Sequence, residues 1–157
     1  MSAPLWTSSD IALVTGGVAT DPFAVTGSVS IDTRTLNPGD LFVALTDQRD
    51  GHDFVEAAFA AGAAGALVSR QVGQGPQVVV EDVLAALEQM GVAARVRCGA
   101  HRTAVTGSAG KTSVKEMLAQ IYRAFGPAHW NVKSFNNHWG VPLTLARMPE
   151  ATSRAVF

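Results

Sequence analysis

A glycine-rich segment near the middle of the chain limits the possible folds more than any other feature. The β-branched pair Val105-Thr106 leads into Gly107-Ser108-Ala109-Gly110-Lys111-Thr112-Ser113, and an amphipathic segment follows directly. A strand, a glycine turn and a helix in this order are typical of a phosphate-binding loop, because the N–H groups and the dipole of a helix N-terminus both favour an anion. Lys111 would reach the outer phosphates of a nucleotide, and the Thr112 hydroxyl would ligate Mg²⁺.

This loop is a short variant of its class. The common pattern G-x-x-x-x-G-K-[ST] would place its first glycine at position 105, where this chain has valine. The alternative interpretation is a glycine-rich strand-to-helix turn with an exposed lysine. The predicted strand before the loop and the predicted helix after it favour phosphate binding, since structural context is what supports such a motif.

Composition narrows the class of protein further. The 157 residues have room for one domain or two small ones, and 47% hydrophobic with 16% charged residues indicates a globular chain. A net charge of −1 gives no field that would attract nucleic acid or a membrane surface. A single cysteine, Cys98, excludes an internal disulfide framework and fits a reducing, cytoplasmic compartment. The N-terminus does not resemble a signal peptide, and no apolar run is long enough to span a bilayer.

The first half of the chain alternates strand and helix patterns, which predicts an α/β fold. Ser8 or Ser9 would cap a helix that Gly16 ends, and residues 37–40 form a turn. The continuous apolar run at 41–45 suits a strand that is buried on both faces. The other expected elements are strands at 25–31, 66–68 and 77–80 and a helix at 52–61.

The second half begins with a connecting helix from Val83 to about Val96. Strands are expected at 101–106, at 129–132 and from Arg154, and a helix is expected after Pro142. The helix after the glycine loop has apolar residues along one face, which predicts a core-facing stripe. That stripe comprises Val114, Met117, Leu118, Ile121, Tyr122 and Phe125. Asn136 and Asn137 are either a turn with a helix cap or groups that bind a polar substrate.

Three blocks in order resemble the Mur ligases of peptidoglycan synthesis. The first block combines Asp32-Thr33-Arg34, Pro38-Gly39-Asp40-Leu41-Phe42-Val43-Ala44 and Asp50-Gly51-His52-Asp53-Phe54. The second is Thr106-Gly107-Ser108-Ala109-Gly110-Lys111-Thr112-Ser113-Val114-Lys115-Glu116, and the third is Asn136-Asn137-His138-Trp139-Gly140-Val141-Pro142. Within the family, the last two blocks favour the ligases that add D-alanyl-D-alanine to UDP-N-acetylmuramoyl-tripeptide.

The resemblance implies a domain organisation. The family has a uridine-nucleotide domain, a central ATP-binding domain and a closing domain. Residues 1–82 would be the small α/β domain that binds the UDP-sugar-peptide. Residues 83–157 would be a connecting helix and the start of the P-loop, parallel-sheet ATPase domain. The resemblance covers about the first third of such an enzyme, so we expect this chain to be inactive alone and the full-length enzyme to be monomeric.

The resemblance also implies roles for individual residues. Those that would hold ATP are Gly107, Ser108, Ala109, Gly110, Lys111, Thr112 and Ser113, with Mg²⁺ on Thr112. Catalysis would involve Lys111, Thr112, Asn136 and Asn137. The uridine diphosphate would contact Ser30, Thr33, Arg34, Thr46, Asp47, Gln48, Arg49, Gly51 and His52. Two positions depart from the family pattern, because Thr46 stands where glycine is usual and Ser134 where asparagine is common.

Two of these residues have alternative, purely structural interpretations, and the function of the chain has alternatives as well. Arg34 would otherwise be a surface arginine paired with Asp32, and His52 a residue at a helix N-terminus. For the whole chain, the alternatives are a nucleotide-binding module without chemistry, a truncated remnant, or an unrelated small P-loop kinase or NTPase. The short loop disfavours the last, as does the lack of a later aspartate at the end of an apolar strand.

Overall fold

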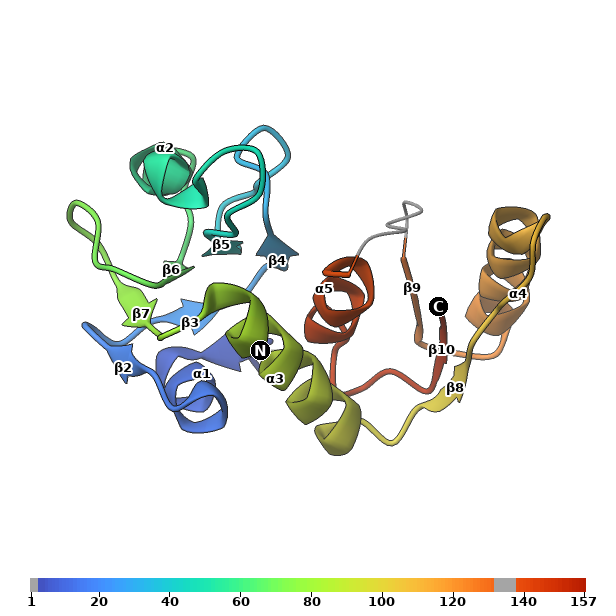
Figure 1. Cartoon of the computed structure of the whole chain (residues 1–157). Helices are drawn as coiled ribbons and strands as arrows, with labels where there is room; N and C mark the ends of the chain where they lie inside the picture. Colours follow the sequence, from blue (N-terminus) through green and yellow to red (C-terminus); the bar gives the residue numbers. More distant parts are fainter. Residues whose placement is uncertain (1–2, 132–137) are drawn as a thin grey trace. The chain divides into compact units, whose positions relative to one another are not determined.

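The computed structural model describes residues 3–131 and 138–157, which group into two units, Met1–Met90 and Gly91–Phe157 (Figure 1). The helix α3 (Val83–Arg97) carries the division between them. The sequence-based boundary at 82/83 precedes this helix, whereas the structural division falls inside it. None of the described helices is long and apolar enough to cross a membrane.

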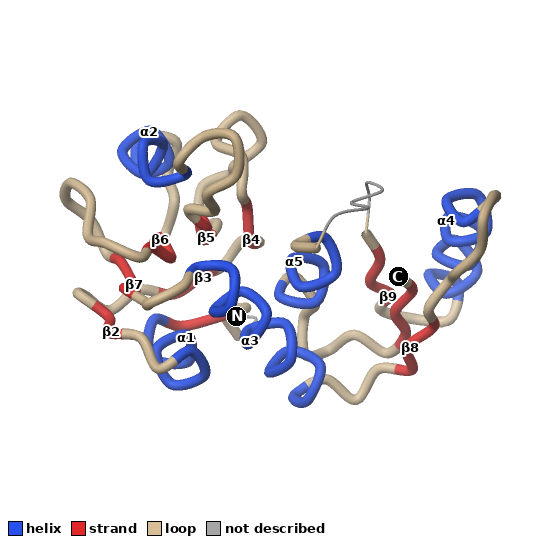
Figure 2. Tube along the Cα trace, in the orientation of Figure 1, coloured by secondary structure: helices blue, strands red, loops and turns tan. Residues whose placement is uncertain are grey.

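The first unit is built on a five-stranded sheet, whose strands are red in Figure 2. In spatial order they are β2 (Val18–Ala19), β7 (Gln77–Val79), β6 (Gly65–Val68), β5 (Leu41–Val43) and β4 (Val29–Ser30). Strands β4 to β7 are parallel, and β2 joins β7 antiparallel. Every residue of β5 is buried, as its continuous apolar run predicted, and every residue of β6 is buried as well.

Helices cover both sides of this sheet (Figure 1). The helix α1 (Ser8–Thr15) packs on β2 and β7 and follows β1 (Trp6–Thr7), which pairs with β3 (Ala24–Val25). On the other side, a short 3₁₀ turn (Gly51–Phe54) leads into α2 (Val55–Ala60). The core beneath α2 consists of Leu36, Phe42, Ala44, Val55, Ala58, Ala66 and Val68.

The start of α1 differs from the expectation by one residue. Thr7, not Ser8 or Ser9, is the N-cap: its hydroxyl accepts from the Asp10 N–H, and the Asp10 carboxylate accepts from the Thr7 N–H. This reciprocal capping box satisfies two N–H groups that a helix start leaves open. Gly16 ends the helix with a φ of 67°, as predicted.

The predicted strand at 25–31 is wrong as a continuous element. It consists of β3 and β4, which pair with different strands. The buried Asp40 carboxylate separates them, since it accepts the Ser28 N–H at 2.6 Å and the Asn37 N–H at 2.9 Å. Gly27 passes so close that an added Cβ would lie 2.2 Å from the carboxylate oxygen. The turn that carries Asp40 is the one predicted at 37–40.

The second unit contains a parallel three-stranded sheet. Its order is β8 (His101–Thr103), β10 (Arg154–Val156), β9 (Ala128–Trp130). The helix α4 (Lys111–Ala124) packs on β9 and β10, and α5 (Gly140–Ala146) follows the segment that is not described. A small buried cluster joins Cys98, Ala100, Met148 and Ala155.

The predicted core stripe of α4 is wrong for this chain. Its only buried residues are Lys115 and Ala119, and the side of the helix that bears them faces the sheet. Leu118 and Tyr122 are half-buried, whereas the rest of the stripe is 43–68% exposed, namely Val114, Met117, Ile121 and Phe125. Periodicity identified an apolar face correctly but could not say which face the sheet would cover.

Candidate functional site

The glycine loop lies where a parallel strand ends and a helix begins. The Val105 N–H donates to the Phe157 carbonyl at 2.8 Å, so the chain stays with the sheet just past β8 before the loop turns away. Gly107 has a φ of 154° and Gly110, the N-cap of α4, a φ of 74°. L side chains rarely adopt either value, so both turns favour glycine. The loop thus presents backbone to solvent at the start of a 14-residue helix.

The side chains predicted to meet phosphate occupy the first turn of α4. Lys111 is the first helical residue and its Nζ donates to the Gly107 carbonyl oxygen, across the loop. Thr112 and Ser113 follow and are exposed. An ammonium, hydroxyls and open N–H groups at a helix N-terminus form an arrangement suited to a polyphosphate. Asn136 and Asn137 lie outside the described residues.

A second lysine on α4 is buried. The Lys115 side chain is 6% exposed, and its Nζ donates to the Asn131 carbonyl at 2.5 Å and lies 3.4 Å from the Glu116 carboxylate. Asn131 follows β9, and its own Oδ1 is buried without a hydrogen-bond partner among the residues that the structure describes. Sequence reasoning did not select Lys115 as a site residue. The available signal was its spacing, four residues after Lys111 and therefore on the same side of the helix.

In the first unit, polar residues gather at one edge of the sheet. Because β4, β5 and β6 are parallel, their carboxyl ends share that edge. Segments 30–35, 46–50 and 69–70 leave these three strands in turn. Open α/β sheets bind their ligands at this edge. The structure thus brings to one edge the substrate-site residues predicted in the first unit.

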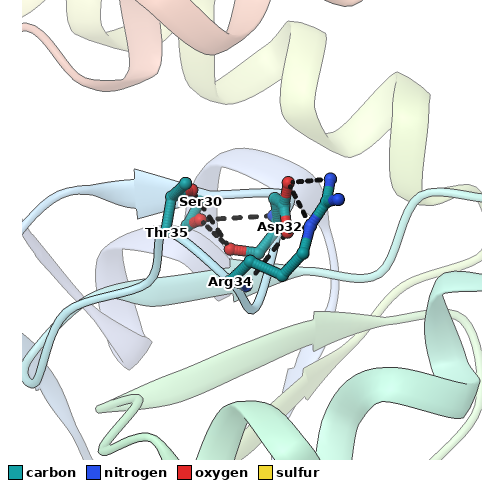
Figure 3. A network of polar contacts seen from close by, with 4 residues as sticks. All are labelled: Ser30, Asp32, Arg34 and Thr35. Carbon is teal, nitrogen blue, oxygen red and sulfur yellow. Dashed lines mark hydrogen bonds and ion pairs between the residues drawn. The ribbon is translucent and has the colours of Figure 1, made fainter.

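The segment after β4 folds into a tight polar turn (Figure 3). The Ser30 hydroxyl donates to the Asp32 carbonyl at 3.0 Å and accepts the Asp32 N–H at 3.2 Å. Arg34 donates to the Asp32 carboxylate through Nε at 2.9 Å and Nη2 at 2.7 Å, and this hydrogen bond and charge raise the pKa of Arg34. The surface pairing considered for Arg34 is therefore present. Its side chain is still 86% exposed, and Thr33 beside it is half-buried.

The segment after β5 is a closed loop. Thr46 and Asp50 form an antiparallel bridge, and the Asp47 N–H donates to the Arg49 carbonyl at 3.1 Å. Thr46, Asp47, Gln48 and Arg49 are exposed. Gly51 is buried, and a Cβ there would lie 2.4 Å from the Leu45 carbonyl oxygen. Glycine at 51 is therefore explained by the close return of the chain onto the end of β5.

His52 is almost completely buried, with 2% of its side chain exposed. Its Nδ1 lies 2.6 Å from Asp50 Oδ1, and its Nε2 accepts the Ser69 N–H at 2.9 Å. Arg70 donates to Asp50 Oδ2 at 2.8 Å. Hydrogen bonds from the His52 backbone, Arg70 and the His52 ring, in that order, lower the pKa of Asp50 below its usual range.

Sequence reasoning did not identify Ser69 and Arg70 as residues of this site. The signal was present, since two polar residues directly follow the fully buried strand β6. Over the described part of the chain, no three His, Cys, Asp or Glu side chains cluster in a way that could hold a metal ion.

A glycine loop with the phosphate-binding pattern on a parallel sheet, together with another α/β unit, is typical of nucleotide-binding α/β proteins. Residues 105–157 match the Mur ligase middle domain. The chain is 39% identical to the UDP-N-acetylmuramoyl-tripeptide--D-alanyl-D-alanine ligase of Bacillus subtilis, over 96% of this chain and 35% of that protein. The chain belongs to the Mur ligase family.

Solved structures agree with this assignment. The crystal structure of MurF from Acinetobacter baumannii superposes with a TM-score of 0.79 at 31% identity, over 97% of this chain and 35% of that one. MurF ligase from Thermotoga maritima, in complex with ADP, gives 0.65 at 25% identity, over 84% of this chain and 31% of that one. The chain therefore spans about a third of the length of these relatives.

Proposed function

We propose that the protein to which this chain belongs is the ATP-dependent ligase that joins D-alanyl-D-alanine to UDP-N-acetylmuramoyl-tripeptide. The observation that carries the proposal is the glycine loop at the start of α4, in a chain with 39% identity to a ligase of that name. The lone, buried Cys98 is compatible with a cytoplasmic reaction. We further propose that the full-length enzyme is monomeric.

ATP would bind at the loop of residues 107–113. Its phosphates would lie over the N–H groups at the start of α4, with Lys111 on the outer phosphates. The positive φ values of Gly107 and Gly110 fit this role. They favour glycine, and a residue without a side chain leaves the exposed loop backbone open to the phosphates. Thr112 would offer one oxygen to Mg²⁺, which neutralises charge on the phosphates when bound. Asn136 and Asn137 are proposed to line the same site.

The reaction would proceed in two displacements. A carboxylate oxygen of the tripeptide attacks the γ-phosphorus of ATP, and the bond to the ADP oxygen breaks, which gives an acyl phosphate. The amine of D-alanyl-D-alanine then attacks the acyl carbon, phosphate leaves and the nitrogen loses a proton, which gives the amide. Phosphoryl transfer needs positioning and charge neutralisation more than covalent help, and Lys111 supplies part of that charge.

The uridine diphosphate would bind at the carboxyl edge of β4, β5 and β6. The exposed groups there include Arg34 and the loop of residues 46–49, which contains Arg49. Arginine side chains are cationic donors that suit a diphosphate. We assign the UDP-sugar-peptide to the first unit and ATP to the second. A chain that holds only these parts would bind ligands without completing the reaction.

Calorimetric titration of this chain tests both assignments. We expect heat of binding with Mg·ADP and, separately, with UDP-N-acetylmuramoyl-tripeptide. The matched controls are the Lys111→Ala variant for the first ligand and the Arg34→Ala variant for the second, and each should weaken only its own ligand. A folded chain that binds neither at millimolar concentration would rule out the proposed sites. Phosphate release by this chain alone, dependent on both substrates, would contradict the expectation that it is inactive.

A further inference from the structure

The His52 imidazole has no ring nitrogen left for a ligand. Among the described residues, its Nδ1 lies 2.6 Å from Asp50 Oδ1, and its Nε2 lies 2.9 Å from the Ser69 backbone nitrogen and 3.1 Å from Ser69 Oγ. Only 2% of the side chain is exposed. Both nitrogens are therefore used inside the fold, even though the family resemblance placed this residue among the substrate contacts.

The partners determine the protonation of the ring. A backbone N–H is only a donor, so Nε2 must carry the lone pair that accepts from Ser69. A neutral imidazole then has its proton on Nδ1, which points to a carboxylate that only accepts. Both contacts are therefore satisfied by the same tautomer, with the proton on Nδ1 and the lone pair on Nε2.

Asp50 connects this ring to the exposed loop. Its Oδ1 accepts from the Thr46 hydroxyl at 3.2 Å and from the His52 N–H at 3.0 Å. Its Oδ2 accepts from Arg70 at 2.8 Å. One carboxylate therefore closes the loop of residues 46–50 on itself, and His52 and Arg70 fasten it to the end of β6.

We infer that His52 is a positioning residue: it holds the loop of residues 46–49 against the end of β6, and a uridine nucleotide meets that loop and Arg70 rather than the imidazole. This inference rests on the proposed function, which assigns the uridine nucleotide to this edge. Arg70 suits the role of an additional contact, because its side chain is 58% exposed and only its Nη2 is engaged by the described residues.

Two matched variants separate the contact of the ring with Asp50 from its contact with Ser69. In His52→Asn the amide nitrogen takes the place of Nδ1 and keeps the bond to Asp50, but it loses Ser69. In His52→Gln the amide oxygen takes the place of Nε2 and keeps the bond to Ser69, but it loses Asp50. Each variant removes one of the two contacts that hold the ring between Asp50 and Ser69, so we expect each to weaken binding of UDP-N-acetylmuramoyl-tripeptide about tenfold. His101→Gln, at an exposed histidine of the second unit, should bind as the wild type does.

Nitrogen-15 NMR of the wild-type ring distinguishes positioning from contact and needs no variant. We expect Nδ1 protonated and Nε2 unprotonated in the free chain, with both ring shifts unchanged when the same ligand saturates the protein. The amide signals of Asp47, Gln48 and Arg49 should move on binding, and in both His52 variants they should differ from wild type before ligand is added.

Three results would overturn the inference while leaving the proposed function intact. These are ring-nitrogen shifts that follow ligand occupancy, the opposite tautomer in the free chain, or wild-type affinity in both His52 variants. Wild-type protein that is folded yet binds no UDP-N-acetylmuramoyl-tripeptide at millimolar concentration would instead remove the proposed uridine site, and the inferred role of His52 with it.

Discussion

The buried ammonium of Lys115 donates to the backbone carbonyl of Asn131 at 2.5 Å. This contact joins the helix that follows the glycine loop to the end of β9. Lys115 lies one helical turn beyond Lys111. Lys111 is exposed to solvent, whereas Lys115 is buried against the sheet. We therefore expect substitution of Lys115 to lower stability and substitution of Lys111 to leave stability nearly unchanged.

Lys115→Met should destabilise the second unit. The variant keeps the length of the side chain but removes the donor, so the Asn131 carbonyl loses its charged partner at a cost of about 1.5–3 kcal/mol. Urea unfolding measures the change, and Lys111→Met is the matched control, with an expected change within about 0.5 kcal/mol. Equal stability of Lys115→Met and wild type would show that the bond contributes nothing to folding.

Lys111→Ala should weaken ATP binding by roughly tenfold or more, because a hydrogen bond from a charged donor contributes about 1.5–3 kcal/mol. The loss should be smaller for ADP and near zero for AMP, since the lysine reaches only the outer phosphates. The measurement is nucleotide titration of the full-length enzyme. An equal loss for AMP and ATP would mean that Lys111 acts through the fold, and the phosphate-loop assignment would have to be withdrawn.

Polar substitutions along the exposed part of the α4 stripe should be tolerated. Met117→Gln with Ile121→Gln should change the free energy of unfolding of this chain by about 0.5 kcal/mol or less, because both side chains are more than half exposed. Ala119→Leu, on the buried side of the same helix, should cost about 1–3 kcal/mol through overpacking. A large cost for the double variant would indicate that something covers the stripe in solution, and sedimentation would test whether that is a second copy.

His129 should make the second unit less stable in mild acid. Burial lowers the pKa of His129 from its ordinary value of 6.5, and this outweighs the hydrogen bond to the Thr144 carbonyl, which raises it. Folding therefore favours the neutral ring. Its contribution to stability is complete above pH 6.5 and is lost as the pH falls below that value.

Urea unfolding at about pH 7.5 and about pH 5.5 measures this loss. His129→Gln should flatten the pH dependence, whereas the exposed His101→Gln should leave it as in wild type. A wild-type slope in His129→Gln would show that another group is responsible.

Sequence patterns correctly predicted those helices and strands that depend only on the residues within them. The apolar run that begins at Leu41 is the buried strand β5, and the glycine loop precedes a helix that begins at Lys111. The break between β3 and β4 was not predictable in this way, because it depends on the Asp40 carboxylate, which comes from a turn later in the chain. The alternation of polar and apolar residues at 25–31 carries no information about a side chain from residue 40.

The candidate sites show the same limit. Sequence patterns selected His52 because of its place in a motif, but its Nε2 accepts a hydrogen bond from Ser69, seventeen residues away. Arg70 was overlooked because its only signal in the sequence was its position just after the apolar strand β6. The direction in which α4 turns its apolar stripe is likewise set by the sheet it meets and not by its own periodicity.

The strand order of the second unit has a consequence for how the protein is made. Within the described parts of the chain, strands β8 and β9 are not hydrogen-bonded to each other: each pairs with β10, which comes later in the sequence than both. As the chain leaves the ribosome, the glycine loop and α4 therefore emerge before any sheet exists to support them. Parallel pairing over long sequence separations is slow to form, because loop closure precedes the stabilising contacts. The second unit should acquire its structure only after Arg154–Val156 has been synthesised, and until then its nascent chain is in the partly folded state on which chaperones act.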